Sequence, residues 1–519
     1  MIVTYSMIPH MKHCTKYIKN WYVVLIPLVL FGCGTNFEYN VTSELNPSKI
    51  SPLTAMLNIT ANAPCTGIAT VLGEFPVEYE FDLSGTELEV PIIGLYPGIE
   101  NQILLNLDHE GGSVVDTILI TTEALPDFIP SVEINKMDRS RMEPGMHLCD
   151  LHYAKHGTYD SRPMIFDDQG KVRWFLDLSF FGDIIWPIQR LKNRSLLVAG
   201  KNEIYEFDML GRVVKNYTLD PKYRIHHDIV ELPDGKLLLA VRTDDVFIQY
   251  EGEQIPSWND IVILFDPETE QIEREWDFAK HMDVSRSEMN YTVQTDWLHM
   301  NGLAFDPKDS SIVMSGKNQG VAKVSWNDEL QWILAPKKYW GKAGRNGEGP
   351  ETSSYLLTAV DADGTPYDEE VQNGSVSHED FDFPWGQHAP EILENGNIIL
   401  YDNGYKRHFD HEVLYSRGVE FHINVEDMTV QQIWQYGKER KREFYSMLIS
   451  DVDYLPETEN ILITAGFIYH NSKIVEVEPN TGEEVFEATL TLKTLNGDKT
   501  FNWGQLDLLY RSERFVLEY

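Results

Sequence analysis

The sequence predicts an all-β protein in which a six-bladed β-propeller follows a small immunoglobulin-like β-sandwich. Three observations predict this fold. Short runs of alternating apolar and polar residues, bounded by turn residues, fill residues 51–122. A strand-turn-strand unit then recurs about six times along the rest of the chain. No segment keeps an apolar period of 3.6 residues over several turns, so long helices are not expected.

The composition fits a folded chain with a large core. Of 519 residues, 42% are hydrophobic and 12% are aromatic, which excludes a disordered chain. The 81 acidic residues outnumber the 43 basic residues and give a formal net charge of −38. Binding to nucleic-acid phosphates needs a basic face, so this charge argues against a nucleic-acid partner.

Residues 1–32 have the pattern of an export signal. Three lysines precede a short apolar run, residues 21–31, which ends in Leu30-Phe-Gly-Cys33. That ending resembles a bacterial lipobox and predicts cleavage before Cys33, acylation of Cys33 and a periplasmic, lipid-anchored protein. Gly34 is not the aspartate of inner-membrane retention, so the outer membrane is the expected location. The alternatives are an uncleaved signal anchor or a chance cysteine.

Composition shifts divide the remaining chain. Residues 33–50 are polar and predict a tether, residues 51–125 predict the sandwich, and residues 126–519 predict the propeller.

Cys65 and Cys149 fall in different predicted domains, so we expect them to be unpaired. Residues 341–383 are polar, acidic and rich in glycine, and such long loops are either lids over a site or disordered insertions.

Two copies of the repeat are clear and carry histidine at the same position. His227 and His388 each stand eight positions before a turn glycine, Gly235 and Gly396. Looser copies begin near Ile188, His299 and Asp451, and a further unit lies over 146–178. Each unit reads as a four-stranded meander that cannot cover both faces alone. Packing six such units in a ring covers the faces, which predicts the propeller.

The repeat places three histidines at equivalent positions. His227, His299 and His388 stand near the start of innermost strands, which meet at one mouth of the central channel. Lys317 follows a strand of the same blade as His299 and brings a cation nearby. His226 should point to the face opposite His227 if both lie on a regular strand, and the repeat register favours His227 as the inward residue.

The histidines have two alternative interpretations. Any one of them alone is more often a capping or solvent-exposed group. Three imidazoles with an open position also suit zinc, but Lys317 would repel a cation and no carboxylate pattern orients the rings. The sequence therefore predicts no metal and no cofactor.

Seven motifs follow one another along the chain after the tether. They are Arg224-Ile-His-His-Asp228, Asp296-Trp-Leu-His-Met-Asn301, Gly386-Gln-His-Ala-Pro390, Tyr401-Asp-Asn-Gly404, Tyr415-Ser-Arg-Gly-Val-Glu-Phe421, Trp434-Gln-Tyr-Gly-Lys-Glu-Arg440 and Ser450-Asp-Val-Asp-Tyr-Leu455. In sequence and order they resemble motifs of the bacterial arylsulfate sulfotransferases. The resemblance covers most of the chain after the tether, and that family has a small N-terminal β domain and a six-bladed propeller.

The resemblance implies transfer of a sulfuryl group from a phenolic sulfate ester to a phenolic acceptor. His388 matches the family nucleophile that becomes sulfated in a ping-pong mechanism. His227 and His299 match histidines that bind the sulfuryl oxygens and exchange protons with the phenols. Family members are often homodimers, so a homodimer is expected by analogy.

The sequence departs from the family at Lys317, where an arginine is usual. An ammonium is a point charge and cannot grip two sulfate oxygens as a guanidinium does. Tyr415 and Arg417 are expected to support the channel wall, and Asp402 and Asn403 to form a structural turn. The predicted catalytic set is His388, His227, His299 and Lys317. The alternative functions are a non-catalytic propeller that binds a surface glycan or protein, and a metal-dependent hydrolase using the same histidines.

Overall fold

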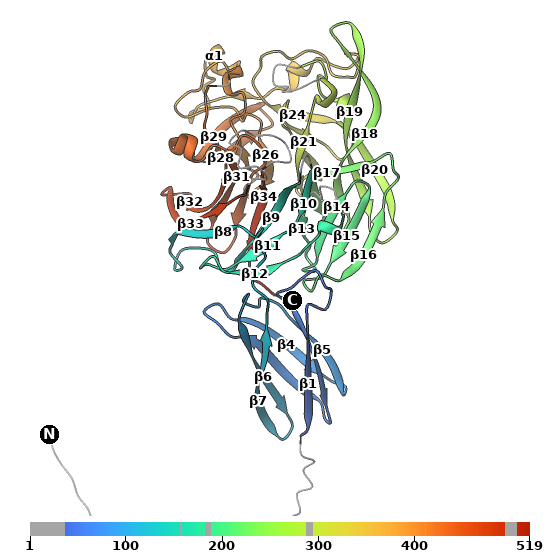
Figure 1. The fold of residues 1–519 in the computed structure, drawn as a ribbon. Helices are drawn as coiled ribbons and strands as arrows, with labels where there is room; N and C mark the ends of the chain where they lie inside the picture. Colours follow the sequence, from blue (N-terminus) through green and yellow to red (C-terminus); the bar gives the residue numbers. More distant parts are fainter. Residues whose placement is uncertain are drawn as a thin grey trace, which may run out of the picture.

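A computed structural model describes residues 37–155, 158–181, 188–286, 294–410, 412–493 and 506–518. Figure 1 shows a ring of β-sheets with a smaller β-sandwich at one end of the ring. The segment with the predicted export signal and Cys33 lies outside the described residues. Within the described residues, no helix has both the length and the apolar character needed to cross a membrane.

The sandwich consists of two antiparallel sheets, as predicted. Alternate residues of its strands are buried, as along β6 where Ile103, Leu105 and Leu107 face the core. The first sheet has the order β1 (Tyr39–Leu45), β2 (Ala55–Ala61), β5 (Glu87–Ile92), and the second β4 (Val77–Leu83), β3 (Cys65–Val71), β6 (Glu100–His109), β7 (Gly112–Thr121).

The predicted tether over 33–50 is wrong for Tyr39–Leu45, which form a strand of the sandwich. Strand β1 pairs antiparallel with β2 over its whole length, and Tyr39, Val41 and Leu45 pack against the core. As an edge strand, β1 buries only part of one face and therefore carries few apolar residues, so its sequence looks like a linker.

Six sheets form the propeller. Their innermost strands line one central cavity of about 360 Å³. From the inside outwards, the first sheet consists of β34 (Leu508–Phe515), β9 (Met146–Lys155), β11 (Met164–Phe166) and β12 (Val172–Phe175), and β10 (Thr158–Ser161) also pairs with β9. The second sheet consists of β13 (Ile188–Arg190), β14 (Leu196–Gly200), β15 (Glu203–Phe207) and β16 (Val213–Thr218).

The next two sheets continue the ring in chain order. They are β17 (Arg224–Glu231), β18 (Leu237–Tyr250), β19 (Glu253–Asp266) and β20 (Gln271–Asp277), and then β21 (Met300–Asp306), β22 (Ser311–Gly316), β23 (Gly320–Val324) and β24 (Leu330–Leu334). The fifth sheet consists of β26 (His388–Ile392), β27 (Ile398–Asp402), β28 (Arg417–Asn424), β29 (Thr429–Tyr436) and β25 (Thr358–Ala359). The sixth consists of β30 (Asp451–Leu455), β31 (Asn460–Ile468), β32 (Asn471–Glu478), β33 (Glu483–Thr491) and β8 (Ser131–Met137).

Strands from both ends of the propeller close the ring. The C-terminal strand β34 is the innermost strand of the first blade, and β8 adds an outer strand to the last blade. Each terminal segment thereby completes a sheet formed mainly by the other end of the chain. This closure leaves only short exposed sheet edges.

Residues 341–383 fold as part of the fifth blade. They contain η4 (Thr352–Tyr355), β25 and the short helix α1 (Glu369–Gln372), and β25 pairs parallel with β29. Phe381 and Phe383 are buried in the same apolar cluster as the blade strands. The segment is therefore an ordered outer edge of the blade, not a disordered insertion.

The other short helices are 3-10 turns: η1 (Ser179–Phe181), η2 (Phe278–Lys280), η3 (Gln294–Asp296), η5 (Arg407–Phe409) and η6 (Lys438–Glu443). Cys65 and Cys149 are buried and free, as predicted.

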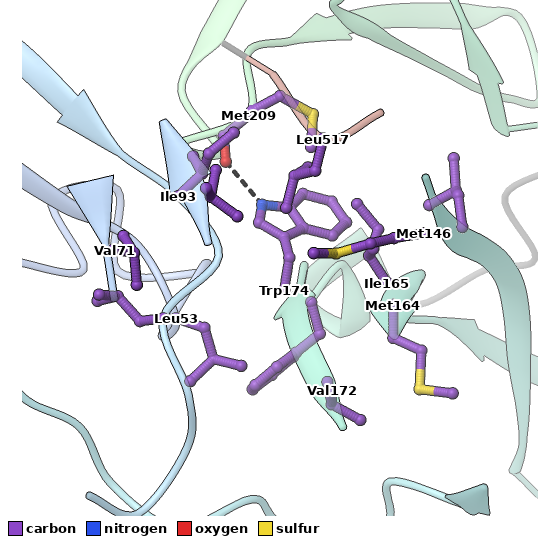
Figure 2. Close-up of a cluster of buried hydrophobic side chains, with 14 of the residues drawn as sticks. Leu53, Val71, Ile93, Met146, Met164, Ile165, Val172, Trp174, Met209 and Leu517 are labelled. Atoms are coloured by element: carbon purple, nitrogen blue, oxygen red, sulfur yellow. Dashed lines mark hydrogen bonds between the residues drawn. The ribbon is translucent and has the colours of Figure 1, made fainter. Parts of the chain in front are cut away.

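The two domains share one apolar cluster around Trp174, shown in Figure 2. Leu53 and Ile93 of the sandwich and Leu517 of the C-terminal tail pack near this ring. The Trp174 indole N–H donates to the Met209 carbonyl at 2.7 Å. The shared apolar packing places the sandwich at the end of the propeller where β34 finishes.

Replacing Trp174 by alanine is expected to lower the free energy of unfolding by about 3–5 kcal/mol, because the ring is fully buried and its indole N–H is hydrogen-bonded. Thermal melting followed by circular dichroism checks this. Val213→Ala is the matched control: Val213 is 54% exposed, so its loss should change stability by less than about 0.5 kcal/mol. Equal melting points for the two variants would contradict the assigned packing.

Candidate active site

The structure brings the three predicted histidines together at one mouth of the channel. His227 lies in β17, His299 directly before β21, and His388 begins β26. The rings of His227 and His299 are 4.9 Å apart between centroids, and the charges of His388 and Lys317 act on His227. Tyr510, near the start of β34, contacts His227, whereas Leu517 after its end lies beside Trp174. The mouth with the histidines is therefore at the end opposite the sandwich.

A β-bulge lies at the equivalent place in each of the three strands. Register shifts fall between Ile225 and Ile229, between Met300 and Gly302, and between His388 and Glu391. The backbone φ angles inside or next to these bulges are positive: 61° at His227, 55° at His299 and 49° at Ala389. Such conformations cost about 1–3 kcal/mol each and gather at functional sites. Here they turn neighbouring side chains toward the mouth.

The expectation for His226 is wrong because of the first bulge. His226 and His227 do not point to opposite faces; their Nδ1 atoms are 2.9 Å apart. Strict alternation holds only on a regular strand, and the bulge removes it. His227 faces His299, while Nε2 of His226 lies 3.2 Å from a carboxylate oxygen of Asp260.

The hydrogen bonds of His388 fix its tautomer. Asn403 donates both amide hydrogens, to the carbonyls of Ser446 and Ile449 at 2.8 Å each, so its side-chain oxygen must accept. That oxygen lies 2.7 Å from Nδ1 of His388, and the Gly386 carbonyl lies 3.2 Å from the same nitrogen. Nδ1 therefore carries the proton, and the lone pair is left on Nε2.

The expectation that Asn403 only forms a structural turn is wrong, because its side chain contacts His388. The turn Asp402-Asn403-Gly404 is held by Asp402, whose carboxylate accepts from the Trp385 backbone at 2.9 Å and from Arg417 at 2.8 Å. Arg417 thus supports the site from within the blade. The sequence signal was weak because the side chain of an Asn or Asp residue in a turn ordinarily bonds only the backbone of that turn.

A carboxylate orients His299, which corrects the expectation that no carboxylate does so. Asp296 lies 2.5 Å from Nδ1 of His299, and the Asn318 amide donates to the Asp296 carbonyl at 2.8 Å. Burial would raise the pKa of Asp296, but the neighbouring His299 and Lys317 lower it. The carboxylate stands only three positions before the histidine and could have been found from that spacing.

Lys317 supplies a cation to the same mouth. It follows β22 and is half-buried, and its backbone N–H donates to the His299 carbonyl at 3.0 Å. Its ammonium lies 5.3 Å from the centre of the Tyr405 ring. Burial lowers the pKa of Lys317, and the charge of Asp296 opposes that shift.

Burial keeps the two inward imidazoles neutral. It lowers the pKa of His388 well below the usual range for histidine, and the positive charge of Lys317 lowers it further. The pKa of His227 is also lowered well below that range, by burial and by the neighbouring imidazoles. A neutral His388 with a free Nε2 lone pair is a competent nucleophile.

The channel below the histidines is acidic. Its lining includes Glu391, Asp451, Asp453 and Glu513, while the Asp228 carboxylate is paired with Arg511 at 2.8 Å. Burial raises the pKa of these four carboxyls, to about 7 at Glu391 and to about 6 at Asp451, and Arg190 and Lys192 line the same cavity. Over the described residues, no three His, Cys, Asp or Glu side chains are grouped as a metal ion would require.

Comparison with known proteins assigns the family. A family model described as Arylsulfotransferase (ASST) matches residues 131–502, and one described as Arylsulfotransferase Ig-like domain matches residues 42–123. The chain belongs to the arylsulfotransferase family. The two matched regions correspond to the propeller and the sandwich, and the second includes most of β1.

Curated relatives of this arylsulfotransferase include two proteins named Arylsulfate sulfotransferase AssT. The chain is 27% identical over 515 residues to that of Escherichia coli O6:H1 and 25% identical over 515 residues to that of Lelliottia amnigena, in each case covering 82% of this chain and 84% of the relative. Among solved structures, the WD40 domain of Toxoplasma gondii coronin has a TM-score of 0.35 at 8% identity, covering 76% of this chain and 87% of that one.

Proposed function

We propose that this arylsulfotransferase moves a sulfuryl group from a phenolic sulfate ester to a phenolic acceptor through a sulfated His388. The observation that carries the proposal is the fixed tautomer of His388: the Asn403 side-chain oxygen accepts its Nδ1–H, and no hydrogen bond from a described residue occupies Nε2. The family assignment supports the substrate class.

The proposed first half-reaction forms one bond and breaks one. Nε2 of His388 attacks sulfur, the bond from sulfur to the aryl oxygen breaks, and the phenolate leaves. His299, paired with the Asp296 carboxylate, gives the phenolate a proton, while neutral His227 and Lys317 bind the sulfuryl oxygens. Asn403 stabilises the positive charge that the ring gains when Nε2 carries the SO3 group.

The proposed second half-reaction reverses these steps with a new phenol. The same histidine that protonated the leaving group takes the acceptor's proton. The phenolic oxygen attacks sulfur, and the bond between nitrogen and sulfur breaks, which restores neutral His388. Neither step consumes water, and the burial of His388 limits loss of the SO3 group to hydrolysis.

The direct test incubates the protein with 4-nitrophenyl sulfate without an acceptor and analyses its peptides. We expect the peptide containing His388 to gain the mass of one SO3 group, and to lose it when a phenol is added. A group found only on another residue overturns the proposal. Turnover that stops in excess chelator would instead favour the metal-dependent hydrolase.

Replacing Asn403 by alanine is expected to slow sulfation of His388 by about 10–100-fold. A buried hydrogen bond that is lost costs about 1–3 kcal/mol, which corresponds to that change in rate. Rapid-quench labelling measures the rate, and 15N chemical shifts of His388 should show the proton partly moved to Nε2. Asn397→Ala is the control, because Asn397 lies in the same blade and bonds His422 instead. Unchanged 15N shifts in Asn403→Ala would contradict the positioning role.

The rate of His388 sulfation is expected to stay level from neutral pH to below pH 6.5. The reactive form is neutral, and a lowered pKa means that the proton binds only at lower pH. The rate should then fall as pH drops through the pKa of His388. Rates of His388 labelling between about pH 4 and pH 8 measure this fall, the acid limb of the pH profile. A midpoint at or above pH 6.5 would contradict the assigned burial.

We propose further that the protein is a periplasmic lipoprotein anchored to the outer membrane through Cys33. The proposal rests on the Leu30-Phe-Gly-Cys33 sequence that follows the apolar run. Labelling with radioactive palmitate should mark the wild type and not Cys33→Ser. Equal labelling of both would overturn it.

A further inference from the structure

Two adjoining hollows above the fifth and sixth blades are not used by the proposed chemistry. The first, of about 400 Å³, is called here the aromatic groove; Tyr445, Met447, Phe467 and Tyr469 are among its lining residues. The second is called the basic shelf, and Lys438, Lys441 and Arg442 are among its lining residues. The two hollows share Leu414 and Arg442, so they form one continuous depression.

The aromatic groove is connected to the catalytic mouth by residues that hydrogen-bond the support of His388. Met447 stands in the loop whose Ser446 and Ile449 carbonyls hold Asn403, the residue bound to His388. The backbone of Phe467 donates to the Ser446 hydroxyl at 3.0 Å.

A second contact comes from the opposite side. Phe467, Leu506 and Tyr510 belong to one apolar cluster, and the Tyr510 hydroxyl donates to the His227 carbonyl at 2.7 Å. The groove therefore touches the supports of both His388 and His227.

The basic shelf differs in charge from the rest of the protein. The chain carries a net charge of −38, yet across the described part of the chain no carboxylate lies within 4 Å of Lys438, Lys441 or Arg442. The adjacent Arg440, in contrast, is paired with three glutamates, and one of them, Glu443, also lines the shelf. Glu412 also lines the shelf, and the charges of Asp382 and Asp402 act on Lys438. Lys441 and Arg442 have no ion-pair partner among the described residues, and two such cations beside an apolar hollow suit a ligand with an aromatic ring and a negative charge.

We propose that the aromatic groove binds the ring of the phenolic substrate and that the basic shelf binds an anionic substituent on that ring. This inference rests on the proposed function and narrows its substrate class to aryl sulfates and phenols that carry a second anionic group. Ring burial against Met447, Phe467 and Tyr469 supplies affinity, and charge-assisted hydrogen bonds from Lys441 and Arg442 supply selectivity.

The test compares two acceptors with the same ring, 4-hydroxyphenylacetate and the neutral 4-(2-hydroxyethyl)phenol, with 4-nitrophenyl sulfate as common donor. We expect wild-type kcat/KM to favour the carboxylate. Arg442→Gln and Lys441→Gln should each lower that preference about tenfold, the effect of about 1.4 kcal/mol from one charge-assisted hydrogen bond. Lys171→Gln is the control, because Lys171 is exposed on the turn before β12 and far from the mouth. Tyr469→Ala should raise KM for both acceptors.

Binding of 4-hydroxyphenylacetate by calorimetry separates failure of this inference from failure of the proposed function. If His388 is sulfated but wild type shows no preference, or the Arg442 and Lys441 variants keep it, the inference is wrong. If His388 is never sulfated but wild type binds the carboxylate about tenfold more tightly than Arg442→Gln does, the groove is supported and the sulfohistidine is wrong. Equal binding by wild type and both variants overturns the inference whatever the turnover.

Discussion

His388→Ala should abolish sulfation of the protein and lower turnover of 4-nitrophenyl sulfate by at least about 10⁴-fold. Removing the atom that forms the covalent intermediate leaves only binding and electrostatic stabilisation, and neither provides a two-step path. No other described histidine at the mouth has the same arrangement. His299 is bound to the Asp296 carboxylate, and His227 contacts His226. Release of 4-nitrophenol with and without acceptor measures the loss.

The control for this variant is His422→Ala in the same blade. His422 is exposed and bonds Asn397, so its removal tests the loss of a histidine without touching the mouth. Thermal melting of both variants shows whether the propeller still folds. Turnover of His388→Ala within tenfold of wild type, in a folded protein, would remove His388 as the nucleophile of the mechanism.

The repeat made the blades and the meeting of the histidines predictable. Equal spacing from His227 and His388 to their turn glycines places both residues at the same position on inner strands. Ring closure then brings together residues that are far apart in sequence. The all-β propeller and the N-terminal β domain were predicted correctly for this reason.

The details that tune the site could not be predicted from periodicity. A bulge leaves the apolar pattern of a strand nearly unchanged, so the sequence did not show that His226 and His227 point to the same side of the strand. Asn403 orients His388 only because carbonyls 43 and 46 positions later fix its amide. Such a contact depends on the fold as a whole. The strand β1 was missed because an edge strand needs few apolar residues.

Replacing Lys317 by methionine should slow sulfation of His388 by about 10²–10³-fold, the usual effect of losing one group that stabilises a developing oxyanion. Methionine keeps most of the length of the side chain and removes the charge together with the N–H donors. Lys317→Arg should retain most of the rate, because a guanidinium binds sulfate oxygens in pairs. Rapid-quench labelling of the three proteins compares the rates directly.

A pH profile distinguishes this role from a local ion pair. The charge of Lys317 lowers the pKa of His388, so Lys317→Met should raise that pKa and move the acid limb of the rate to higher pH. Lys317→Arg keeps the charge and should leave the limb in place. If Lys317 only neutralised Asp296, its loss would act on His299 through that carboxylate, and the limb set by His388 would not move. If Lys317→Met is slow but the acid limb of its pH profile does not shift, the ammonium does not act on His388. Its role would then be to neutralise the Asp296 carboxylate.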